Sequence, residues 1–114
     1  MHTVVETPSY LSAARSAGID DELRAEIVSL VGENPALGDV LEGTGGFRKF
    51  RVARSGGGKS GGYRVVSYFW DEDIPVFLIT VFAKNQRANL TQAERNELKK
   101  LSSRIVDTYR QRKP

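Results

Sequence analysis

The segment between Phe47 and Arg64 combines a high density of positive charge with a complete lack of negative charge. Six basic residues fall within these eighteen positions, and no aspartate or glutamate lies among them. Such a run raises the local concentration of phosphate polymers and gains free energy when counterions are released. The segment therefore favours phosphate or nucleic-acid binding over the alternative, a solvated basic surface. The six residues are Arg48, Lys49, Arg51, Arg54, Lys59 and Arg64.

Side-chain alternation along β-strands selects four cations as one candidate site. In the strand predicted for residues 47–54, Lys49 and Arg51 lie on one face, about 7 Å apart, because alternate side chains share a face. Arg64 on the next predicted strand can approach the same patch. Lys84 follows the last predicted strand, and the ends of strands are where sites are often built.

Four convergent cations are compatible with RNA cleavage by the RNA's own 2′-hydroxyl group. Such cleavage needs a base at that hydroxyl, charge stabilisation at phosphorus and an acid at the leaving 5′-oxygen. Nearby positive charge disfavours the protonated form of a lysine, so Lys49 is the candidate base. Arg51 and Arg64 always stay charged and are the candidates that hold the phosphate. RNA binding without catalysis is the alternative that these residues leave open.

A glycine-rich stretch, residues 55–62, contains Gly58-Lys59-Ser60, the end of the P-loop pattern. That pattern requires another glycine five residues before Gly58, where this chain has Ala53. It also requires a helix after the loop, whereas strands are predicted on both sides. We therefore expect the tip of a β-hairpin carrying Lys59, and no nucleotide-triphosphate site.

The composition of the 114 residues excludes several kinds of chemistry. The absence of cysteine removes disulfides and thiolate catalysis, and a single histidine, His2, removes histidine triads and multi-histidine metal sites. We expect no metal and no cofactor. No apolar run approaches the ~20 residues of a membrane span, and no signal-peptide pattern opens the chain. The sequence thus predicts one cytoplasmic domain, residues 1–114, with no membrane contact.

Hydrophobic periodicity and capping residues predict an α+β fold. Three helices are expected, two near the N-terminus and one near the C-terminus. Thr7-Pro8, Asp20 and a Thr91/Glu94 capping box are typical of helix starts. The sheet is expected to be small and mostly antiparallel, with about four strands and a loop over residues 35–46. The predicted strands cover residues 2–6, 47–54, 63–70 and 75–83.

An ordered set of motifs resembles the RelE superfamily, most closely its HigB-like branch of toxins from bacterial type II toxin–antitoxin modules. The set begins with Gly43-Thr44-Gly45-Gly46 and the basic strand Phe47–Val52. It continues through Gly58-Lys59-Ser60-Gly61-Gly62 with Arg64, then Phe82-Ala83-Lys84-Asn85 and Leu90-Thr91. Each motif alone is weak evidence for the family, but the order of the motifs along nearly the whole chain is specific to it.

The resemblance implies metal-independent endoribonuclease activity on mRNA, typically in the ribosomal A site, and inhibition of translation. It places the catalytic residues at Lys49, Arg51, Arg64 and Lys84, with further RNA contacts from Arg48, Arg54, Lys59 and Arg87. The tyrosine that stacks on a base in RelE has no aromatic counterpart here between Asn85 and Thr91.

The implied partners are mRNA, the ribosome and a cognate DNA-binding antitoxin. The N-terminal residues 1–46 carry a net charge of −6, against +9 for residues 47–114, so the acidic helices are not expected to contact RNA. They can face the antitoxin or simply be solvated. Two alternatives stay open: a non-catalytic RNA- or ribosome-binding module, and a toxin of this superfamily that acts on another target such as DNA gyrase.

Overall fold

Five strands and three helices make up the part of the chain that the structure describes. This computed structural model describes residues 1–53, 62–85 and 89–112, with the last three by their backbone alone. The elements in chain order are β1 (Val4–Glu6), α1 (Pro8–Ala17), α2 (Asp21–Glu33), β2 (Asp39–Val40), β3 (Phe47–Val52), β4 (Tyr63–Tyr68), β5 (Val76–Ala83) and α3 (Gln92–Arg112).

The helices begin where the capping residues predict. The Thr7 side chain accepts a hydrogen bond from the Tyr10 amide, and the Asp20 carboxylate accepts one from Leu23 at 2.8 Å. Before α3, the backbone amide of Thr91 donates to the Glu94 carboxylate at 2.8 Å, while the Glu94 amide donates to the Thr91 hydroxyl at 3.1 Å. This reciprocal pair satisfies amides that a helix start otherwise leaves without partners.

The strands form one sheet in the order β1-β5-β4-β3-β2, with β1 parallel to β5 and the other pairs antiparallel. The α+β class is confirmed, but the expected count of about four strands is one too low. The fifth strand is β2, inside the region predicted as loop. It has only two residues, Asp39 and Val40, both exposed, so it offers no hydrophobic alternation to detect.

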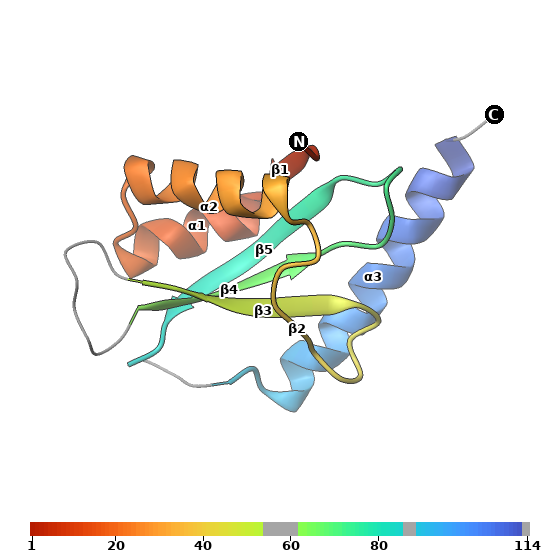
Figure 1. Cartoon of the computed structure of the whole chain (residues 1–114). Helices are drawn as coiled ribbons and strands as arrows, with labels where there is room; N and C mark the ends of the chain where they lie inside the picture. Colours follow the sequence, from red (N-terminus) through yellow and green to blue (C-terminus); the bar gives the residue numbers. More distant parts are fainter. Residues whose placement is uncertain (54–61, 86–88, 113–114) are drawn as a thin grey trace.

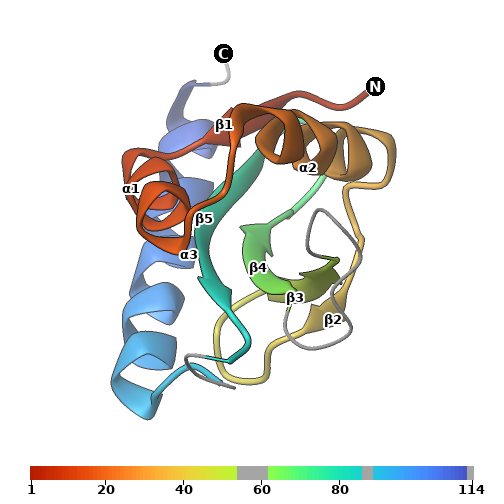
Figure 2. The same cartoon turned by 90° about the vertical axis from the view of Figure 1, so that its left-hand side faces the viewer.

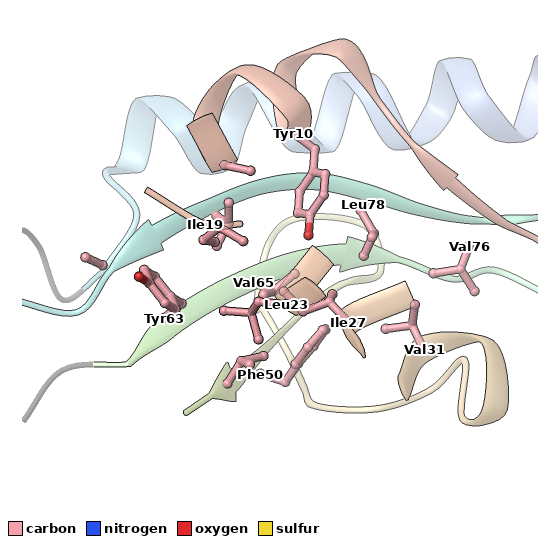
Figure 3. Close-up of a cluster of buried hydrophobic side chains, with 14 residues drawn as sticks. Tyr10, Ile19, Leu23, Ile27, Val31, Phe50, Tyr63, Val65, Val76 and Leu78 are labelled. Carbon is pink, nitrogen blue, oxygen red and sulfur yellow. The ribbon is translucent and has the colours of Figure 1, made fainter. Parts of the chain in front are cut away.

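The helices cover opposite faces of the sheet. In Figure 1, α1 and α2 lie above the sheet and α3 crosses its other side, and Figure 2 shows the same layers from one end. Beneath α1 and α2, a buried cluster joins Tyr10, Ile27, Phe50 and Val65, as Figure 3 shows. Beneath α3, a second cluster contains Phe47, Tyr68, Phe82, Leu98 and Val106. Two apolar layers therefore hold the sheet between them.

A β-bulge lets β5 supply both layers. Val66 pairs with Thr80 and the next residue, Ser67, pairs with Leu78, so β5 has one extra residue at this point. Val76 and Leu78 face α1 and α2 before the bulge, and Val81 and Ala83 do so after it. The alternation thus shifts by one position within a strand that is apolar on both sides.

Burial of the Tyr10 hydroxyl gives a test of this packing. Burial, helped by the Glu6 carboxylate, raises the pKa of Tyr10 to about 12, and among the described residues the hydroxyl finds no hydrogen-bond partner. Because the pKa of Tyr10 is higher in the folded state than in the unfolded state, its neutral side chain adds to the free energy of unfolding. This contribution is complete below the unfolded-state pKa near 10 and is lost as the pH rises through about 12. We expect Tyr10→Phe to show a shallower loss of stability between these two pH values. At pH 7 its free energy of unfolding should be unchanged or up to about 1 kcal/mol higher, because no hydrogen bond is lost.

Urea unfolding at several pH values measures this effect. An equally steep alkaline loss in Tyr10→Phe, or a lower stability at pH 7, would contradict it.

None of the three helices is long and apolar enough to cross a membrane, as judged over the described residues.

Candidate functional site

The register of the sheet brings the four predicted site cations to one region. Lys49 pairs with Val66, and Arg51 pairs with Arg64, which in turn pairs with Phe82. Because residues paired across strands share a face, these side chains lie on the face that α3 packs against. Lys84 follows β5 two residues after Phe82, and its backbone amide donates to the Gly62 carbonyl at 3.1 Å, which keeps it beside β4.

Arg51 and Arg64 form the centre of this cationic face, which we define as Lys49, Arg51, Arg64 and Lys84. Their Cα atoms are direct partners across β3 and β4, so their Cβ atoms lie about 5 Å apart. Like charges placed opposite each other destabilise a sheet. The Arg64 side chain is half-buried, and its Nε atom is buried with no hydrogen-bond partner in the described part of the chain. The pair therefore costs the fold stability, and a bound anion would relieve that cost.

Lys49 lies beside two polar residues that the sequence analysis did not single out. Its ammonium nitrogen contacts the Asn89 side-chain oxygen at 3.5 Å, which joins β3 to the segment before α3. Its partner across β2 and β3 is Asp39, with Val40 opposite Arg48. The paired residues of β2 and β3 are symmetric about Thr44, so a hairpin centred on the glycine-rich turn was the one sequence signal that could have pointed to Asp39. Nothing in the sequence indicates the contact with Asn89.

Arg48 is separated from the cationic face. It lies between Lys49 and Phe47 in β3, so its side chain takes the opposite face, where it donates to the Ala36 carbonyl at 3.3 Å. Its Nε atom is buried without a partner among the described residues. Three other predicted RNA contacts, Arg54, Lys59 and Arg87, lie outside the described residues, as does nearly all of the predicted hairpin tip.

The turn that connects β2 to β3 also anchors α3. The buried Thr44 hydroxyl donates to the Leu41 carbonyl at 2.6 Å and accepts from the Phe47 amide at 3.2 Å. Gly45 has φ +82°, and a Cβ atom there would clash with the Ser102 hydroxyl of α3. The turn thus needs glycine for its backbone and for the close approach of the helix.

A matched pair of glycine substitutions separates these two needs. Gly43 has a similar φ, +75°, but a Cβ there would meet nothing within 4 Å. We expect Gly43→Ala to lose about 1 kcal/mol of stability from backbone strain, and Gly45→Ala to lose at least about 1 kcal/mol more. Adding Ser102→Ala to Gly45→Ala should recover part of the difference. Equal losses in the two single variants, measured by urea unfolding, would show that contact with α3 contributes nothing.

The described residues include no group of three or more histidine, cysteine, aspartate or glutamate side chains arranged to hold a metal ion. What the cationic face offers is fixed positive charge and the forked donors of two arginines, which match the oxygens of a phosphodiester.

Comparisons with known proteins agree with this architecture. A structure of the E. coli toxin RelE, a double mutant in the free state, matches with a TM-score of 0.52 and 23% sequence identity, over 94% of this chain and 96% of that chain. At this identity the match shows the shared fold. The sequence model of the family described as the RelE toxin of the RelE/RelB toxin–antitoxin system matches residues 3–112. Because that match spans nearly the whole sequence, the chain belongs to the RelE toxin family.

Proposed function

We propose that this protein is the toxin of a type II toxin–antitoxin system and an endoribonuclease that cleaves mRNA, on the ribosome in the A site, and so inhibits translation. Membership of the RelE toxin family supports the toxin role. The activity would be exerted in the cytoplasm, where mRNA is translated, and would use neither metal nor cofactor.

The observation that carries this proposal is the direct pairing of Arg51 with Arg64 on the face that also holds Lys49 and Lys84. In a protein with no anionic ligand this pairing would be unfavourable. A phosphodiester bound between the two guanidinium groups would attract both of them and so replace their mutual repulsion with a net attraction. The negative charge that develops at phosphorus during cleavage would strengthen this attraction further. The arrangement therefore suits a phosphate in its transition state better than one in its ground state.

A cognate antitoxin follows from the family. The antitoxin would neutralise this toxin either by covering the cationic face or by barring its entry to the ribosome. Either route leaves α1 and the acidic helix α2, on the opposite side of the sheet, available as a second surface for the antitoxin.

Induced expression in a bacterial host, followed by mapping of 5′ ends on total mRNA, tests the proposal. Wild type should stop growth and create new ends inside translated frames. Lys49→Ala and Arg64→Ala should do neither while remaining folded. Arg15→Ala is the matched control, because it removes one exposed positive charge from α1 on the other side of the sheet and should remain as toxic as wild type.

Each other outcome selects an alternative. Growth arrest without new ends would indicate a binding module, or a toxin that acts on another target such as DNA gyrase. New ends that persist in both site variants would show that the cleaving residues lie elsewhere.

A further inference from the structure

The cationic face has a carboxylate at its edge. Asp39 in β2 is the direct partner of Lys49 in β3, so its side chain lies on the same face as Arg51 and Arg64. Asp39 is exposed, and within the described ranges no ion pair joins it to a basic side chain. The carboxylate is therefore free to act on a bound molecule.

Asp39 is the only carboxylate that the five strands place on this face. The one other acidic strand residue, Glu6 in β1, pairs with Leu78 and so shares the face that α1 and α2 cover. The Cβ atom of Asp39 lies about 5 Å from that of Lys49 and about 7–8 Å from that of Arg51, its diagonal neighbour. A nucleotide whose phosphate is held by Arg51 and Arg64 would thus have its ribose within reach of Asp39.

The chemistry of the proposed cleavage needs a proton acceptor at the 2′-hydroxyl. A carboxylate has free lone pairs that can accept a proton, whereas a lysine ammonium carries only donors and must lose a proton before it can accept one. We propose that Asp39 is a catalytic residue that accepts the 2′-hydroxyl proton, while Lys49 acts as a fixed positive charge. This inference rests on the proposed ribonuclease function and reassigns the base from Lys49 to Asp39.

Cleavage by this route forms one bond to phosphorus and breaks another. The 2′-O–H bond breaks and its proton passes to the Asp39 carboxylate, while the 2′-oxygen forms a bond to phosphorus. The bond from phosphorus to the 5′-oxygen breaks, and that oxygen takes a proton from the Lys84 ammonium. The products are a 2′,3′-cyclic phosphate and a 5′-hydroxyl end. In the strand order, Asp39 on β2 and Lys84 after β5 lie on opposite sides of the Arg51–Arg64 pair, as an in-line displacement requires.

Single-turnover cleavage of a defined mRNA on programmed ribosomes tests the assignment across pH. Asp39→Asn keeps the shape of the side chain and removes its basicity. We expect it to slow cleavage by at least about 10²-fold with little change in apparent affinity, and to abolish the acidic limb of the wild-type pH profile. Lys49→Arg should stay within about ten-fold of wild type, because arginine cannot act as a base but retains the charge. The control Glu22→Gln removes the same charge from the exposed surface of α2 and should cleave at the wild-type rate.

The outcomes distinguish the inference from the function on which it rests. If wild type cleaves and Asp39→Asn cleaves equally fast, or slows while it keeps the acidic limb, the base is not Asp39 although the protein is a ribonuclease. If Lys49→Arg does not cleave RNA while Asp39→Asn does, the base at the 2′-hydroxyl is Lys49. If wild type itself does not cleave, the proposed function fails and the inference fails with it.

Discussion

Arg64→Ala is expected to lower the rate of RNA cleavage by about 10²–10³-fold, the loss typical of removing one group that stabilises developing negative charge. Arg64 sits between Arg51 and Phe82 in the middle of the cationic face, so its guanidinium is well placed for a phosphodiester. Arg64→Lys keeps the charge but loses the planar fork, and we expect a smaller loss of about ten-fold. Single-turnover cleavage with the purified protein measures both.

The same substitution should leave the fold intact. Because Arg51 and Arg64 repel each other across the ladder, Arg64→Ala should leave the free energy of unfolding unchanged or raise it by a few tenths of a kcal/mol. An activity loss accompanied by a large fall in stability would instead indicate a structural role for Arg64. Urea unfolding of the same samples separates the two explanations.

Phe47→Ala is expected to have the largest effect on stability, a loss of about 3–5 kcal/mol. The Phe47 ring is fully buried under α3, and its centroid lies 4.6 Å from that of Tyr68. Removing it leaves a cavity between the sheet and the helix, two residues from Lys49. A fall in Tm of roughly 10–25 °C should accompany this loss.

A more conservative change provides the control for Phe47. Phe47→Leu retains most of the apolar volume and should lose about 1–1.5 kcal/mol while keeping full toxicity. A loss below about 1 kcal/mol in Phe47→Ala would mean that α3 packs against the sheet without this ring.

Local signals in the sequence predicted much of this molecule. Thr7, Asp20 and the Thr91/Glu94 box sit at helix starts because their side chains satisfy backbone amides within three residues, a rule that needs no tertiary information. Alternation along β3 correctly predicted that Lys49 and Arg51 share one face, because the alternation of side chains in a strand is also a local rule.

Features that depend on distant segments could not be predicted. The bulge in β5 depends on its pairing with β4, and the contact between Lys49 and Asn89 joins residues forty positions apart. Asp39 was missed because a two-residue exposed strand carries no periodic pattern. The HigB-like placement within the family and the RNA contacts of Arg54, Lys59 and Arg87 stay predictions.

The parallel pairing of β1 with β5 has a consequence for the order of folding during synthesis. Val4 pairs with Val76, and Glu6 pairs with Leu78, so the first strand made has no partner until the fifth strand has been translated. β5 also precedes Lys84 and lies under α3, so the core and the cationic face are completed together, late in synthesis. Contacts of such long sequence separation slow folding, because the chain must close a large loop before they contribute free energy. A growing chain of this toxin therefore lacks its assembled site for most of the time that the ribosome takes to make it.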